Sequence, residues 1–418
     1  MKKVLILTPY YPPMLNVAGL RYFELTKYFL KNNWDPYILT INDKNTVSQD
    51  GHVYRIPLNS PTRSYIPFGH YPPSSNQTAI PSSSPAYDNK WLAYLLTPYY
   101  IPDGFRFWAR HQLKRWAKKI VNDKSIDLIM VGCGPFSVGL AAEDIKRELG
   151  VPYILDFRDG LTLNPYRIYS SRVSRFVEIF ERNLLKNSAG LVTTTPSTTA
   201  AYLEKYHFLI NRAVTVTNGF DDEVFDHLPR SHDPQQFTIT YSGVIDEHRD
   251  IEPLIKIFLD LQLPRARLVI IGQINRPSTK ELIANQPTIY YLGQRSRIDS
   301  LKQILGANLL VLSQGFQILN TKCQPIAAKT FEYLRTGAPI LSIAPPGDNT
   351  DIIREYCRQP YLITEPSDDK IRQSLLDCYR RWERNQITYQ PKPEFLENFN
   401  REHLAAKMCW FFNQVLNI

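Results

Sequence analysis

The residues best suited to bind a substrate lie in the segment 329–334 (KTFEYL), which we expect to begin a helix. A charged carboxylate in the first turns of a helix is unusual unless it contacts a hydroxyl group or a cation. A ribose has two hydroxyls and would give Glu332 a bidentate contact. The alternative is a structural Glu332 that interacts favourably with the helix dipole.

A second charged segment, 156–159 (DFRD), lies at the end of a predicted strand in the first half of the chain. At such a strand end Asp159 would orient a substrate hydroxyl or balance the charge of Arg158. A buried Arg-Asp pair with a purely structural role is the alternative.

Gly132 and Gly134 imitate the start of a dinucleotide-binding fingerprint after the predicted strand 128–131. Ser137 occupies the place of the third glycine, which argues against an NAD site. Gly134 and Pro135 more simply indicate a tight turn close to substrate.

The segment 105–121 has Trp108, Leu113, Trp116 and Ile120 at helical spacing. The same segment also contains six basic residues, which would suit an anionic membrane surface. The alternative is a helix packed on the core with a solvated basic face. The cations are Arg106, Arg110, Lys114, Arg115, Lys118 and Lys119.

Apolar runs alternate with helical stretches along most of the chain, which is the pattern of parallel α/β sheets. The pattern predicts two Rossmann-like, doubly wound domains that face each other across a cleft, where ligands bind beyond the carboxyl ends of the strands. Predicted strands in the first are 4–7, 36–41, 128–131, 153–157 and 190–194, and in the second 237–241, 266–271, 288–292, 308–312, 339–343 and 361–364.

The same pattern sets the expected domain bounds. The first domain should span 1–230 and include a Pro- and Ser-rich surface excursion over 60–102. The second should span 237–395, after a linker over 229–236. An apolar stripe over 396–418 predicts a helix that crosses back to the first domain.

The composition limits the classes of partner. The chain has 418 residues, 43% of them hydrophobic, and a net charge of +9, which favours an anionic partner such as phosphate, nucleic acid or an acidic membrane. The five cysteines form no CxxC pair, so neither a disulfide framework nor a zinc site is indicated and a reducing cytoplasm fits best. The start of the chain reads as a strand rather than a signal peptide. No apolar run is long enough to span a membrane, so membrane association should be peripheral.

Several motifs, taken in order, resemble those of glycosyltransferase family four, the retaining nucleotide-sugar glycosyltransferases of the GT-B fold. The likeness covers nearly the whole chain, and the ordered set is far more specific than any single motif. The motifs are 9–13 (PYYPP), 18–21 (AGLR), 134–135 (GP), 156–159 (DFRD), 181–185 (ERNLL), 217–221 (TNGFD) with Phe225, 241–243 (YSG), 292–293 (LG) and 329–334.

The resemblance implies roles for individual residues. Glu332 looks like the carboxylate that binds the nucleotide ribose, and Gln324 stands where the family often has a second Glu near the donor sugar. Arg249 falls where a diphosphate-binding Lys is expected, whereas the expected Arg position holds Val244, so Lys329 would supply the missing charge. The other implied donor contacts are Gly19, which precedes the first helix, Gly243 and Gln294. Arg158 lies about where many relatives have a His facing the donor sugar.

By this resemblance the first domain binds the acceptor and the second binds the nucleotide sugar. The expected reaction is sugar transfer, with retention, from a nucleoside-diphosphate sugar to a glycan or lipid-linked acceptor in cell-surface polysaccharide or glycoconjugate synthesis. The donor is a co-substrate, no cofactor is expected, and the absence of paired carboxylates at metal spacing predicts metal independence. We expect a cytoplasmic protein in peripheral contact with an anionic inner membrane face and no nucleic-acid partner. The alternatives are a nucleotide-sugar epimerase or hydrolase on the same fold, and a non-catalytic polyanion- or polysaccharide-binding protein.

Overall fold

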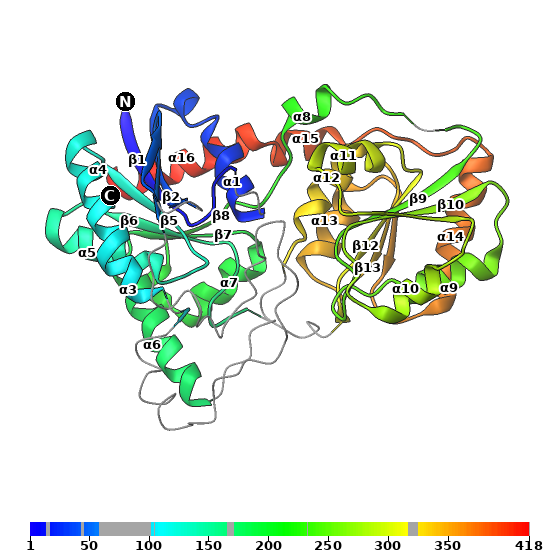
Figure 1. Cartoon of the computed structure of the whole chain (residues 1–418), viewed down its shortest axis with the longest axis horizontal. Coiled ribbons are helices and arrows are strands. Elements are labelled where there is room, and N and C mark those ends of the chain that lie inside the picture. Colours follow the sequence, from blue (N-terminus) through cyan, green and yellow to red (C-terminus); the bar gives the residue numbers. More distant parts are fainter. Residues whose placement is uncertain are drawn as a thin grey trace. The chain divides into compact units, whose positions relative to one another are not determined.

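The chain forms two compact units, Met1–Thr217 with Leu404–Ile418 and Asn218–His403 (Figure 1). The structure is a computed structural model that describes residues 1–13, 17–42, 46–57, 102–103, 105–164, 171–231, 233–316 and 325–417. The predicted excursion over 60–102 lies outside these residues except for Pro102.

The first unit is built on an eight-stranded sheet with the order β3-β4-β2-β1-β5-β6-β7-β8. All neighbouring strands run parallel except β3 and β4, which pair antiparallel at one edge. The strands are β1 Lys2–Leu7, β2 Trp34–Asn42, β3 Ser48–Asp50, β4 Val53–Pro57, β5 Leu128–Gly132, β6 Tyr153–Phe157, β7 Gly190–Thr193 and β8 Ala213–Thr215.

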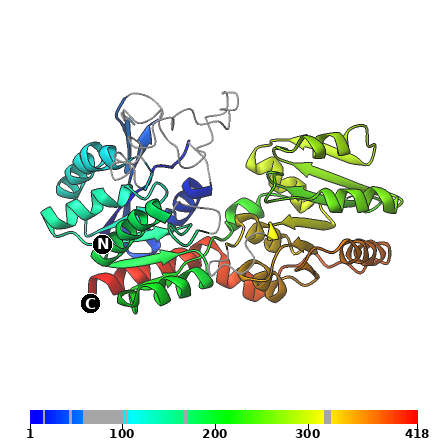
Figure 2. The same ribbon diagram turned by 90° about the horizontal axis from the view of Figure 1, so that it is seen from below.

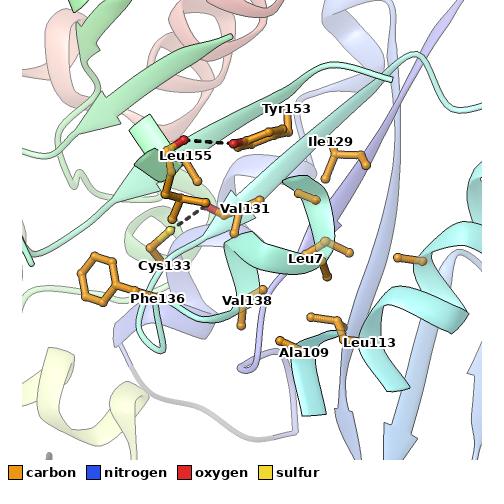
Figure 3. Close-up of a cluster of buried hydrophobic side chains, with 14 of the residues drawn as sticks. Leu7, Ala109, Leu113, Ile129, Val131, Cys133, Phe136, Val138, Tyr153 and Leu155 are labelled. Atoms are coloured by element: carbon orange, nitrogen blue, oxygen red, sulfur yellow. Dashed lines mark hydrogen bonds between the residues drawn. The ribbon is translucent and has the colours of Figure 1, made fainter. Parts of the chain in front are cut away.

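Helices cover both faces of this sheet, because side chains of a strand alternate between its faces. Leu5 and Leu7 join the core under α4 to α7, part of which is seen in Figure 3, whereas Val4 and Ile6 pack under α1 and α16. The longer helices are α1 Val17–Thr26, α4 Lys114–Lys124, α5 Val138–Leu149, α6 Ser171–Asn187, α7 Pro196–Lys205 and α16 Arg401–Asn417. Shorter turns are η1 Leu30–Asn32, α3 Arg106–Trp108, η2 Ala109–Leu113 and η3 His207–Leu209. Figure 2 shows α16, in red, among the elements of the first unit.

The predicted basic amphipathic helix corresponds to α3, η2 and α4, and it packs as a core helix. Trp108 is only 1% exposed, and Trp116 packs against the same core. Lys114 and Lys118 both bind Glu148 on α5, at 2.5 and 2.8 Å. The tryptophans and two of the cations that suggested a membrane surface are therefore engaged within the unit.

The second unit has a six-stranded, all-parallel sheet with the order β11-β10-β9-β12-β13-β14. The helices α9 and α14 pack on one face, and α11, α12, α13 and α15 pack on the other. The strands are β9 Phe237–Ser242, β10 Ala266–Ile271, β11 Ile289–Gly293, β12 Leu309–Ser313, β13 Ile340–Ile343 and β14 Pro360–Ile363. The helices are α8 Asp222–Asp226, α9 Glu252–Leu261, α10 Pro277–Ile283, α11 Arg297–Leu305, α12 Ala328–Thr336, α13 Asp348–Tyr356, α14 Asp368–Glu383 and α15 Pro393–Phe399.

These sheets confirm the predicted fold class of two doubly wound parallel-sheet domains. The division of the chain differs from the expected bounds, since the second unit begins at Asn218 rather than after a linker over 229–236. Phe220 and Phe225 explain the shift, because both are buried in the core of the second unit. The backbone of Phe220 also pairs with that of Asn400.

A fully buried ion pair ties together the carboxyl ends of strands in the first unit. The guanidinium of Arg21, on α1, donates to Asp156 at 2.9 Å, and both side chains are 0% exposed. Arg21 also donates to the carbonyls of Val216 and Thr217, each at 2.8 Å. The buried Arg-Asp pair is thus Arg21 with Asp156, whereas Arg158 and Asp159 form a separate, partly exposed pair.

Removing one partner of this pair should be costly, because the other charge would remain buried without compensation. We expect Asp156→Asn to lower the free energy of unfolding by about 3–5 kcal/mol. Asp159→Asn is the matched control, and its loss should be below about 1 kcal/mol because that pair is partly exposed. Urea unfolding of the two variants measures both values, and equal losses would contradict this account of the pair.

Candidate functional site

Each sheet has a point where the strand order reverses, and ligands of doubly wound folds bind beyond the carboxyl ends of strands at such points. The reversal falls between β1 and β5 in the first unit and between β9 and β12 in the second. In the second unit Gly243 directly follows β9, while Lys329 and Glu332 lie on α12, the first helix described after β12. The main donor-binding residues predicted from the sequence therefore lie at the carboxyl end of this sheet, as expected.

Lys329 is held against the backbone at the end of β9. Its ammonium donates to the carbonyl of Ser242 and lies 5.2 Å from the centre of the Tyr241 ring. Burial, and after it the charge of Arg249, lowers the pKa of Lys329 to about 8. Glu332 acts in the opposite direction and favours the charged form. A partly desolvated cation in this position favours an anionic ligand.

Two glycines allow the backbone at the ends of β9 and β10 to lie close to the Lys329 ammonium and to each other. Gly243 has a φ of +155°, and a Cβ there would collide with the Lys329 ammonium. Gly272, at the end of β10, has a φ of +120°, and a Cβ there would collide with the Gly243 carbonyl. Tyr333 fixes the same turn, because its hydroxyl accepts from the Ser242 N–H at 3.1 Å. The geometry of this strand end therefore requires glycine at both positions.

Glu332, the predicted ribose ligand, contacts a cation that the sequence did not indicate. Arg297, at the start of α11, donates to Glu332 Oε1 from both Nε and Nη2, at 3.3 Å each. Both side chains are about one quarter exposed, at 29% and 24%. Arg297 thus holds the carboxylate in a fixed orientation at the solvent boundary.

The N-terminus of α12 offers further donors. Its N-cap residue, Ala327, provides no side-chain cap, and within the helix the Thr330 N–H donates to the Ala327 carbonyl at 2.9 Å. Asn349, at 3% exposure, accepts from Ala327 N at 3.2 Å and from Thr330 Oγ1 at 2.7 Å. The Nδ2 of Asn349 has no hydrogen-bond partner among the described residues. Such a helix end suits an anion.

The remaining donor candidates are less closely grouped. Arg249 lies near enough to Lys329 to lower its pKa, but its guanidinium is paired with Asp246 three residues earlier, at 2.5 Å. Gln294 is exposed after β11. Gln324 lies outside the described residues. The structure thus brings together Gly243, Lys329, Arg249 and Glu332.

The candidates of the first unit lie at the carboxyl end of its sheet. Arg158 follows β6 and binds Asp159 at 2.7 Å, and this neighbour is the main reason why its pKa is raised. Tyr10, after β1, is close enough to feel the charge of Arg158, while burial raises its pKa. Gly19 does not precede the first helix as expected, since α1 begins at Val17.

Residues 79–219 match the model of the glycosyl transferase 4-like domain. The full length of the chain also superposes on sucrose-phosphate synthase from Thermosynechococcus elongatus, covering 100% of both chains with a TM-score of 0.65 and 14% identity. Residues 79–219 thus form a glycosyl transferase 4-like domain, and the chain as a whole has the GT-B fold. The predicted family resemblance and the enzyme class are thereby confirmed.

Two further structures share the fold of this glycosyltransferase. Anabaena HepE in complex with UDP and glucose gives a TM-score of 0.63 at 13% identity, over 99% of this chain and 100% of that one. WaaG, a glycosyltransferase involved in lipopolysaccharide biosynthesis, gives 0.57 at 12% identity, over 97% and 98%. At such low identity these likenesses establish the fold alone. No curated protein sequence matches the chain.

Two features are absent from the described part of this glycosyltransferase. None of its helices has both the length and the apolar character needed to cross a bilayer. No cluster of three or more His, Cys, Asp or Glu side chains placed to hold a metal ion occurs among the described residues.

The lowered pKa of Lys329 predicts how its contribution to stability changes with pH. The unfolded chain keeps this proton up to about pH 10.5, whereas the folded protein loses it near pH 8. Between these values unfolding takes up a proton, so the wild type should gain stability with rising pH relative to Lys329→Met. Urea unfolding of both proteins at about pH 7.5 and about pH 9.5 measures the difference. Parallel pH profiles would contradict the lowered pKa.

Proposed function

We propose that this glycosyltransferase moves a sugar from a nucleoside-diphosphate sugar to a hydroxyl of a glycan or lipid-linked acceptor, with retention at the anomeric carbon. The observation that carries the proposal is the partly desolvated ammonium of Lys329 at the carboxyl end of β9, with Glu332 three residues further along α12. The ammonium of Lys329 suits a diphosphate, and the carboxylate of Glu332 suits a ribose.

The donor contacts follow from these positions. The diphosphate binds at the N-terminus of α12, where Lys329, backbone N–H groups and the Asn349 amide face negative charge, with Arg249 as a further cation. Glu332, oriented by Arg297, accepts hydrogen bonds from the ribose hydroxyls. HepE was solved with UDP and glucose, which supports a uridine nucleotide as the first donor to test.

The chemistry needs little beyond stabilisation of the leaving group. The bond between the anomeric carbon and the diphosphate oxygen breaks, and the acceptor oxygen bonds to the same face of the sugar. The acceptor proton passes to the departing diphosphate oxygen, so no separate general base is required. Cations and N–H groups fixed where this charge develops lower the barrier without reorganisation. No metal ion is assigned to the reaction, and addition of a chelator tests this because activity should be unchanged.

The acceptor side is assigned to Arg158 and Asp159 in the first unit, where Asp159 orients the acceptor hydroxyl. WaaG, which shares the fold, takes part in lipopolysaccharide biosynthesis, and this supports an acceptor for cell-surface glycan synthesis. An epimerase or hydrolase would consume the donor without any acceptor. The two are separated by whether release of nucleoside diphosphate depends on added acceptor, and retention is read from the anomeric proton coupling of the product.

A thermal-shift screen with UDP-, GDP- and ADP-sugars tests donor binding directly. At least one nucleotide sugar should raise the melting temperature of the wild type, since a ligand that binds the folded state stabilises it by mass action. Glu332→Ala should weaken this nucleotide by about tenfold or more, because a charge-assisted bidentate contact is lost.

Glu355→Ala is the matched control, because Glu355 is an exposed carboxylate on the neighbouring helix α13. It should keep the affinity of the wild type. Absence of any shift in the wild type would overturn the proposal, and an equal loss in both variants would remove Glu332 from the ribose site.

A further inference from the structure

The outward face of α6 combines exposed apolar side chains with cations. Phe176 and Ile179 are 40% and 48% exposed and lie within four residues of each other on this helix. Arg175, Arg182 and Lys186 are exposed on the same helix. In Figure 1 α6 lies along the outer side of the first unit.

Helical spacing places these residues on one side of α6. Arg175, Ile179, Arg182 and Lys186 follow one another at intervals of four, three and four residues, and Phe176 lies beside them. The opposite side is fixed in the core through Val177, Leu184 and Leu185. The packing therefore determines the rotation of the helix and keeps the apolar and basic residues turned outward.

The described residues of the unit do not neutralise the charge of this face. Arg175, Arg182 and Lys186 form no ion pair with any described residue, whereas Lys114 and Lys118 of α4 both bind Glu148. The acidic Glu178 of α6 is itself paired with Lys205, at 3.2 Å. The face thus keeps an excess of positive charge around two apolar side chains.

We propose that this face of α6 docks on an anionic lipid bilayer. The apolar side chains would enter the boundary between headgroups and acyl chains, while the guanidinium and ammonium groups contact lipid phosphates. Charge complementarity to the three cations selects an anionic surface over a neutral one. The proposal moves the predicted membrane contact from the helix over 105–121 to α6.

The buried side of α6 connects this surface to the acceptor candidates. Glu181, which is 0% exposed, accepts from the backbone N–H of Thr162 and from the hydroxyl of Tyr202, each at 2.9 Å. Thr162 follows Arg158 and Asp159 by a few residues in the same loop. Docking through α6 would therefore hold this loop near the lipid surface. The docking itself does not depend on the proposed function. Only the presentation of a lipid-linked acceptor at this loop rests on it.

Sedimentation with vesicles tests the docking without any donor or acceptor. The full chain should bind phosphatidylglycerol-containing vesicles and bind pure phosphatidylcholine vesicles much more weakly. Binding should fall at least about fivefold in the triple variant Arg175→Gln, Arg182→Gln, Lys186→Gln and in the double variant Phe176→Ser, Ile179→Ser. All five positions are exposed, so unchanged melting temperatures should confirm that these variants fold.

The matched control removes the same amount of charge from α4, as Arg115→Gln, Lys118→Gln, Lys119→Gln, and should bind like the wild type. Docking through α6 is overturned if the α6 variants bind like the wild type, if the α4 control loses as much affinity, or if neutral vesicles bind as well as anionic ones. A positive donor screen combined with failed vesicle binding would reject the docking and leave the proposed function standing.

Discussion

The partly desolvated ammonium of Lys329 at the end of β9 is the constraint around which the candidate donor site of the second unit is arranged. Burial lowers its pKa to about 8, which shows that the surrounding protein does not fully replace water. Only glycine at position 243 leaves room for this ammonium, and Gly272 lets the next strand end approach. Tyr333 fixes the same turn by accepting from the Ser242 N–H. A diphosphate bound there would supply the missing negative charge.

Buried charges in the first unit are satisfied in a different way. Arg21 has a carboxylate partner in Asp156 and donates to two carbonyls. Glu181 accepts four hydrogen bonds, three from side-chain hydroxyls and one from a backbone N–H. Charges so fully paired hold loops and helices in place and have little left to give a ligand. This contrast separates the residues that support the architecture from Lys329, to which we assign ligand binding.

Much of the fold could be predicted because parallel strands buried on both faces appear as continuous apolar runs. The predicted strands were found at their expected places, whereas β3, β4 and β8 were missed. All three are short, and β3 is exposed while β4 and β8 are only partly buried. The side chains of the site were harder to predict. Arg297 lies 35 residues before Glu332, and nothing in the local sequence shows that the two meet. Trp108 and Trp116 suited a membrane surface by spacing, but a periodic pattern cannot tell which apolar stripe faces the core.

The most direct test of the account is the proton uptake that accompanies nucleotide binding. Titration calorimetry of UDP at about pH 8.5, in two buffers of different ionisation enthalpy, measures the number of protons exchanged. If the diphosphate meets Lys329, binding should raise the pKa of this group and take up a fraction of a proton, and this uptake should vanish in Lys329→Met. Binding without proton uptake in the wild type, or equal uptake in the variant, would contradict the placement of the diphosphate at Lys329.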